Sequence, residues 1–112
     1  MQLSEYQYMS KRTIPLLEDY KELASNFSMG LSGEAGEVTD LLKKHLFHGH
    51  ILEKDKLEEE LGDVLFYLAG LATIHGLNLE NIAEANVSKL SKRYPEGFDK
   101  DKSINREEYK NA

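Results

Sequence analysis

Four acidic residues stand in two pairs that have the same spacing. Glu34 and Glu37 are three residues apart, as are Glu60 and Asp63, and 22 residues separate the two pairs. On a helix, side chains three residues apart share one face, with about 5–6 Å between their Cβ atoms. Four converging carboxylates repel one another and raise their own pKa values unless a cation lies among them. Mg²⁺ takes oxygen ligands of this kind and Mn²⁺ accepts similar ones, so we predict a site for Mg²⁺, or alternatively Mn²⁺, at these four residues.

The sequence around the two acid pairs is also similar. Residues 34–38 and 60–64 both follow the pattern of an acid, any residue, glycine, an acid and valine. A glycine inside a helix costs about 0.5–1 kcal/mol relative to alanine. Gly36 and Gly62 therefore predict a close approach of two backbones beside the acids. The alternative is a solvated acidic face, which is our interpretation of the neighbouring Glu58 and Glu59.

The elements that must position these acids are predicted to be helices. Apolar residues recur at spacings of three and four, the period of an α-helix. The pattern predicts helices over about residues 3–13, 20–47, 55–75 and 79–94, with a potential interruption of the second near 26–33. Asp55 and Asn78 are predicted N-caps. Gly49 and Gly76 are predicted to end the second and third helices, while Pro15 and Pro95 limit the first and fourth.

The arrangement of the helices follows from their apolar stripes. If the second and third helices pack antiparallel on these stripes, the two acidic flanks converge. Residues 64–72 carry no charge on any face of the third helix, which indicates burial on all sides. We predict an all-α fold: one domain over residues 1–112, a four-helix bundle-like protomer that assembles into a dimer or tetramer, with a polar tail from about residue 96. The alternative is that the helices of a single chain suffice to bury residues 64–72.

The fourth helix offers groups that complement phosphate. Asn86, Lys89 and Arg93 fall along one side at helical spacing, and Tyr67 follows Asp63 by one turn. We predict that these four residues bind a substrate that carries phosphate groups. The alternatives are a structural hydrogen bond for Asn86, a charge pattern that complements the helix dipole for Lys89 and Arg93, and a core position for Tyr67.

The composition limits the classes of function. The chain has 112 residues, no cysteine and a formal net charge of −6. It therefore has no disulfide or thiolate zinc site, and its scattered basic residues do not favour polymeric nucleic acid as a partner. No segment is long and apolar enough to predict a membrane span or a signal peptide. We expect a cytoplasmic protein without a membrane partner.

Histidines supply two further candidates. His45, His48 and His50 cluster at the end of the second predicted helix, where a zinc site is an alternative to hydrogen bonds with helix-end carbonyls. His75 is predicted to be a core residue with satisfied hydrogen bonds. A di-iron site is disfavoured because no histidine follows a glutamate by three residues.

Three segments of the sequence resemble the MazG-like all-α nucleotide pyrophosphohydrolases. They are residues 30–38 (GLSGEAGEV), 59–65 (EELGDVL) and 86–95 (NVSKLSKRYP). The resemblance implies that Glu34, Glu37, Glu60 and Asp63 hold Mg²⁺. It also implies cleavage of an NTP or dNTP to the monophosphate and pyrophosphate by a dimer or tetramer. Some eukaryotic members have tryptophans around the base, and this chain has none.

A mechanism for such a reaction needs positioning and charge neutralisation more than a covalent nucleophile. Glu37 or Glu34 is predicted to orient the attacking water. The alternative functions are a non-catalytic helical module that binds metal or nucleotide, and an oligomeric scaffold with no ligand.

Overall fold

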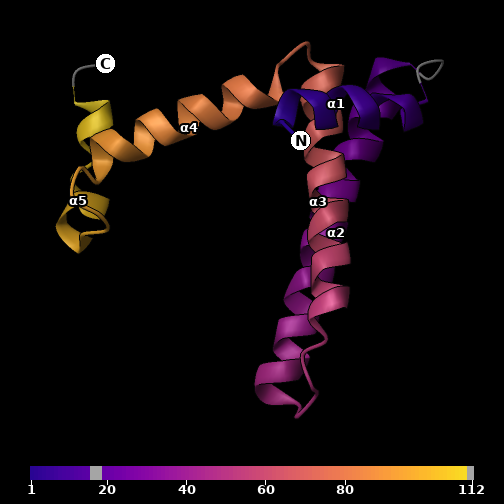
Figure 1. Cartoon of the computed structure of the whole chain (residues 1–112), viewed down its shortest axis with the longest axis horizontal. Helices are drawn as coiled ribbons and strands as arrows, with labels where there is room; N and C mark the ends of the chain where they lie inside the picture. Colours follow the sequence, from indigo (N-terminus) through magenta and orange to yellow (C-terminus); the bar gives the residue numbers. More distant parts are fainter. Residues whose placement is uncertain (16–18, 111–112) are drawn as a thin grey trace.

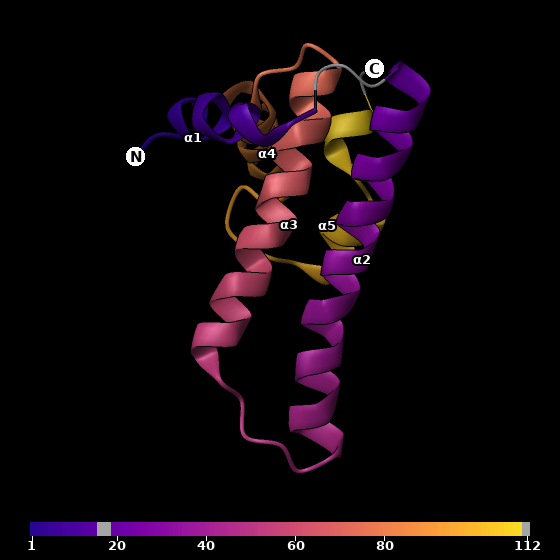
Figure 2. The ribbon, with the colours of Figure 1, turned by 90° about the vertical axis from the view of Figure 1, so that its right-hand side faces the viewer.

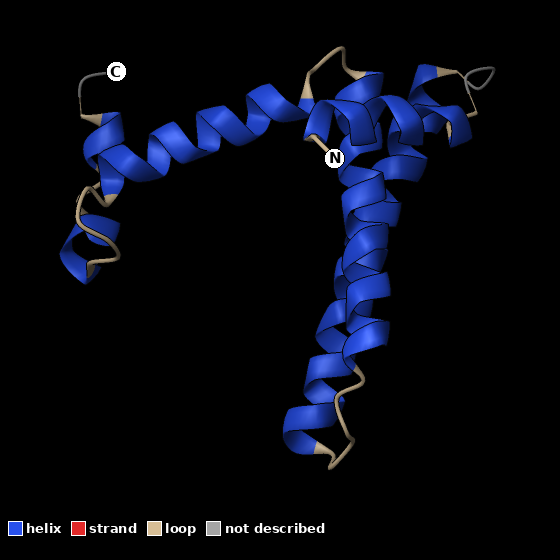
Figure 3. Cartoon of the chain, in the orientation of Figure 1, coloured by secondary structure: helices blue, strands red, loops and turns tan. Residues whose placement is uncertain are grey.

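All regular structure in the described part of the chain is helical. The computed structural model describes residues 1–15 and 19–110, and within these ranges it contains helices and one isolated bridge between Pro95 and Gly97 (Figure 3). The all-α prediction is therefore confirmed. The elements are α1 (Leu3–Ser10), η1 (Lys11–Thr13), α2 (Tyr20–Phe47), α3 (Lys54–Ile74), α4 (Leu79–Arg93), α5 (Lys100–Ile104) and η2 (Glu107–Tyr109), where η marks a 3₁₀ helix.

Local capping sets most helix limits where the sequence predicts them. The Asn78 side chain accepts hydrogen bonds from the amides of Glu80 and Asn81, which confirms it as the N-cap of α4. Gly49 adopts a φ of 73° just after α2, a left-handed conformation that glycine takes without strain. The predicted N-cap at Asp55 is wrong: α3 begins at Lys54 and Asp55 lies in its first turn, where a carboxylate favours the helix dipole. The potential interruption of α2 near 26–33 is absent.

The longest packed unit is an antiparallel hairpin of α2 and α3, which lie side by side along most of their length (Figures 1 and 2). Phe27 of α2 packs against two aromatic rings of α3 that also contact each other, with ring-centroid separations of 5.7 Å to Phe66 and 5.3 Å to Tyr67. Ile14 and Leu23 complete the buried cluster with Phe27. This core lies in the half of the hairpin nearest α1, beyond the acid pairs.

Glycine permits close packing in the hairpin, but at positions other than those predicted. A Cβ at Gly30 would overlap the ring of Tyr67, and a Cβ at Gly70 would overlap the ring of Phe27. By contrast, a Cβ at Gly36 or at Gly62 would meet nothing within 4 Å. The prediction of close backbone approach at Gly36 and Gly62 is therefore wrong, because aromatic rings of the core, and not the backbones beside the acids, require the space.

The fourth helix leaves the hairpin. α4 extends away from α2 and α3, packing chiefly on α1 at its start and on η2 at its end (Figure 1). The four main helices therefore do not close into a bundle within one chain. As a result, the apolar stripe of α4 remains open: Val87 is 63% exposed and Leu90 is 39% exposed. Within α3, Leu68 is 39% exposed, so one chain does not bury residues 64–72 on every side.

The tail predicted to be polar folds into α5 and η2. The apolar residues of this tail, Phe98, Ile104 and Tyr109, are between 55% and 78% exposed, so they bury little surface within the chain. The attachment is ionic instead, because Glu108 of η2 pairs with Arg93 at the end of α4, and both side chains are largely buried. In the described ranges, no helix has the length and apolarity needed to cross a membrane.

Candidate metal centre

Three of the four predicted acids meet between the two helices of the hairpin. Glu34 of α2 and Glu60 and Asp63 of α3 each offer a carboxylate oxygen, and these oxygens all lie within 4.8 Å of one another. Glu34 and Glu60 are half-buried, while Asp63 is exposed. Antiparallel packing of α2 on α3 thus brings together residues that are distant in the sequence, on flanks adjacent to the apolar contact.

Glu60 is the most constrained of the three. Its Oε2 atom is buried and has no hydrogen-bond partner. The pKa of Glu60 is raised above its ordinary value, first by the close carboxyl group of Glu34, then by burial and by the negative charges of Glu34 and Asp63. Among the described residues, none gives the Glu60 carboxylate a positively charged partner. A divalent cation that prefers oxygen ligands fits these three carboxylates. It would supply the missing positive charge and bind the unpartnered oxygen of Glu60.

Glu37 lies outside this group. It is exposed, one helical turn after Glu34, and it is not among the carboxylates that meet within 4.8 Å. Its negative charge contributes to the raised pKa of Lys44, whose main cause is the hydrogen bond with Asp40. The structure thus separates the predicted quartet into three converging acids and a fourth that is adjacent in sequence and open to solvent.

Tyr67 is held by packing. Its ring lies against Gly30 and makes edge contacts with Phe27 and Phe66, at centroid separations of 5.3 and 5.2 Å. The alternative of a core position therefore describes its ring. Binding of substrate by its hydroxyl stays a prediction.

The predicted phosphate-binding residues are not beside the acids in one chain. Asn86, Lys89 and Arg93 lie on α4, which points away from the hairpin (Figure 1). The Arg93 guanidinium is bound by Glu108, and this contact raises the pKa of Arg93 and lowers that of Glu108. Lys89 is half-buried and Asn86 is exposed.

Tyr6, which the sequence did not single out, is affected by the charge of the candidate metal centre. It is half-buried on α1, and its pKa is raised by burial and then by the charge of Asp63. No spacing or motif in the sequence links a tyrosine near the N-terminus to an aspartate on α3. The packing of α1 on α3 brings Tyr6 within range of the negative charge of Asp63.

His45 and His75 make side-chain hydrogen bonds. His45 Nδ1 lies 2.8 Å from the carbonyl oxygen of His50. His75 Nε2 lies 2.8 Å from the Tyr20 hydroxyl and its Nδ1 lies 2.7 Å from the Leu71 carbonyl, so its hydrogen bonds are satisfied as predicted, although it is exposed and not in the core. Among the described residues, the only His, Cys, Asp and Glu side chains that converge as a metal site would require are the three acids. The zinc alternative thus has no converging ligands there.

The fold and the centre together define an all-helical protein with a carboxylate site between two antiparallel helices. Residues 22–98 match the model of the MazG nucleotide pyrophosphohydrolase domain, which spans most of α2 and all of α3 and α4. The chain belongs to this family, which confirms the resemblance seen in its motifs. Both acid pairs and the residues of α4 lie inside the match, whereas α1 and Tyr6 lie outside it.

Two curated proteins are similar to the chain. Gene 37 protein of Mycobacterium phage L5 is 40% identical over 83 residues, which cover 70% of this chain and 73% of that protein. Uncharacterized protein YvdC of Bacillus subtilis (strain 168) is 43% identical over 42 residues, which cover 38% of this chain and 40% of that protein. Neither name states an activity. No solved structure matches the chain.

Proposed function

We propose that the protein is a Mg²⁺-dependent hydrolase of nucleoside triphosphates, ribo or deoxyribo, that releases the monophosphate and pyrophosphate. One observation supports this most directly: Glu34, Glu60 and Asp63 converge within 4.8 Å, with an oxygen of Glu60 buried and unpartnered. Membership of the MazG family agrees with this chemistry. An acidic chain that handles an anionic substrate needs a cation between the two.

The four acidic residues have different roles in this proposal. Glu34, Glu60 and Asp63 would hold Mg²⁺ or Mn²⁺. When bound, the cation neutralises phosphate charge and lowers the pKa of a water molecule. Glu37, which is open to solvent and outside the converging group, orients the attacking water and accepts its proton. The water oxygen bonds to the α-phosphorus as the bond to the bridging oxygen breaks, and pyrophosphate leaves with that oxygen.

Phosphate binding is assigned to α4. Lys89 is the stronger cation for this role, because Arg93 is already neutralised by Glu108. Asn86 can donate a hydrogen bond from the same side of the helix. In a single chain α4 points away from the acids, so we propose that the active form is a homodimer or homotetramer in which a second copy covers the open apolar face of α4. We place the activity in the cytoplasm, where nucleoside triphosphates are abundant.

The test is a direct assay of the purified protein. Each NTP and dNTP is offered with Mg²⁺, and pyrophosphate and the monophosphate are measured together. Equal amounts of the two products support cleavage between the α- and β-phosphates. Release of inorganic phosphate with a diphosphate would contradict the proposed bond. Thermal stabilisation by nucleotide and Mg²⁺ without any product would indicate the non-catalytic binding module instead.

A further inference from the structure

The direction of α4 is set at the short elbow that joins it to α3, residues 75–78. Gly76 takes a φ of 68° there, which turns the chain sharply after α3. Beyond the elbow, α4 packs chiefly on α1 at its start and on η2 at its end. A change of a few backbone angles in such an elbow would swing the whole of α4. Something must therefore fix the elbow if α4 is to keep one direction.

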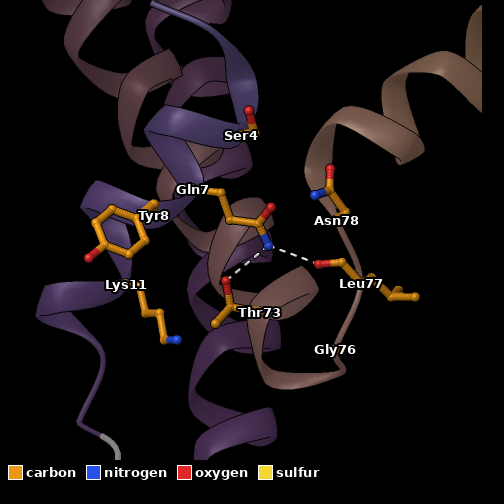
Figure 4. Close-up of a pocket in the computed structure, with 8 residues that line it drawn as sticks. All are labelled: Ser4, Gln7, Tyr8, Lys11, Thr73, Gly76, Leu77 and Asn78. Atoms are coloured by element: carbon orange, nitrogen blue, oxygen red, sulfur yellow. Dashed lines mark hydrogen bonds between the residues drawn. The ribbon is translucent and has the colours of Figure 1, made fainter.

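One side chain of α1 spans the elbow. The Gln7 amide nitrogen donates hydrogen bonds to the Thr73 hydroxyl at 3.1 Å and to the Leu77 carbonyl at 2.9 Å (Figure 4). Its amide oxygen accepts a hydrogen bond from the backbone amide of Leu79 at 2.7 Å. Gln7 thus joins the last turn of α3, the elbow and the first residue of α4.

The bond to Leu79 satisfies a group that the local sequence leaves free. The first backbone amides of a helix have no partner inside it. The N-cap Asn78 takes those of Glu80 and Asn81, whereas the amide of Leu79, a residue only 3% exposed, is taken by Gln7. Losing a partner there would leave a buried donor unsatisfied, which is costly.

We propose that Gln7 is a positioning residue, which fixes the direction of α4 by bonding α1 to both sides of the elbow. Gln7 lies outside the matched residues 22–98. The N-terminal helix α1 therefore helps to set the orientation of α4 and of the residues on it. The consequence for phosphate binding by Lys89 rests on the proposed function, whereas the positioning role itself does not.

The variant Gln7→Met tests this role, because it keeps the length of the side chain and removes all three hydrogen bonds. Gln7 lines an open pocket of about 340 Å³ between α1 and the elbow, so methionine has room. The chain has no cysteine, so Ser88→Cys on α4 and Glu58→Cys on α3 give two unique spin-label sites, both exposed. Diluting labelled protein with unlabelled protein restricts the measured distance to one chain.

We expect a narrow distance distribution in the parent protein and a broadened one with Gln7→Met. Hydrogen exchange at the Leu79 amide should become about tenfold faster, the scale of one lost hydrogen bond, while exchange in the α2–α3 hairpin stays unchanged. Gln7→Glu retains an acceptor for Leu79 and should restore most of its protection. If Gln7 only filled space, Gln7→Glu would protect the Leu79 amide from exchange no better than Gln7→Met does.

Gln2→Met is the matched control, since Gln2 precedes α1, is exposed and makes no capping hydrogen bond through its side chain. It should change neither measurement. If Gln7→Met does not fold, Thr73→Val replaces it, because valine keeps the shape and removes one acceptor. An unchanged distance distribution in the folded variant would overturn the proposal. Neither measurement needs turnover, so failure here is distinct from failure of the proposed hydrolase activity.

Discussion

The carboxyl groups of Glu34 and Glu60, which belong to antiparallel helices, approach each other within 4.8 Å beside Asp63. The close Glu34 carboxyl group, then burial and the negative charges of Glu34 and Asp63, raise the pKa of Glu60 above its ordinary value of 4.5, because each favours the protonated form. Acids that oppose one another in this way weaken the fold until a cation joins them. The first two predictions follow from this contact.

The first prediction concerns pH and Mg²⁺. Between 4.5 and its raised folded value, Glu60 holds its proton more tightly in the native state than in the unfolded state. Its contribution to the free energy of unfolding is therefore present at low pH and is lost as the pH rises through that window. Mg²⁺ competes with the proton, so it should raise the melting temperature by more at pH 8 than at pH 5. Thermal scans with MgCl₂ or EDTA measure this, and an equal Mg²⁺ effect at both pH values would contradict it.

The second prediction separates the acids by role. Glu60→Gln and Asp63→Asn should lower turnover by at least about 100-fold and remove the Mg²⁺-induced rise in melting temperature. Glu37→Gln should lower turnover but keep that rise, because Glu37 lies outside the converging group. The measurements are pyrophosphate release and thermal scans on the same preparations.

Glu58→Gln is the control for these acids, as an exposed carboxylate on the same helix. It should leave both turnover and the Mg²⁺ effect intact. Loss of the Mg²⁺ effect in Glu37→Gln would place that residue among the metal ligands. Retention of full activity by Asp63→Asn would remove Asp63 from the proposed centre.

The third prediction compares glycines within the hairpin. Gly30→Ala and Gly70→Ala should each lower the free energy of unfolding by about 1–3 kcal/mol, since the new methyl group meets the ring of Tyr67 or Phe27. Gly62→Ala should raise it by about 0.5–1 kcal/mol, because a Cβ there meets nothing and alanine favours the helix. Urea unfolding measures all three. Destabilisation by Gly62→Ala would show that the acids need the glycine.

The fourth prediction concerns the open face of α4. Val87 is 63% exposed and Leu90 is 39% exposed, which in a folded helix indicates a missing partner surface. We expect the parent protein to be a dimer or tetramer by light scattering, and Val87→Glu with Leu90→Glu to shift it to the monomer. Ser88→Glu, an exposed position on the same helix, should not. A monomeric parent protein would contradict the proposed assembly.

The sequence predicted more of the candidate metal site than of the packing around it. Spacing placed each acid pair on one face of its helix, and the expected antiparallel packing of the two helices then predicted that Glu34 meets the acids of α3. Spacing could not show that Glu37 lies outside the converging three, which depends on how the helices cross. The repeated glycine also suggested that Gly36 and Gly62 make room for a contact between backbones. The structure instead requires that room at Gly30 and Gly70, where aromatic rings pack.

The sequence by itself determined the four main helices, the N-cap of α4, the glycines that follow α2 and α3 and the two acidic flanks, since these depend on residues within a few turns of one another. Tertiary structure alone decided the projecting course of α4, the proximity of Tyr6 to Asp63 and the hydrogen bonds of Gln7. Tyr6 and Gln7 each interact with residues more than fifty positions away in the sequence. Such pairs carry no shared period or motif, so only the packing of the folded chain brings them together.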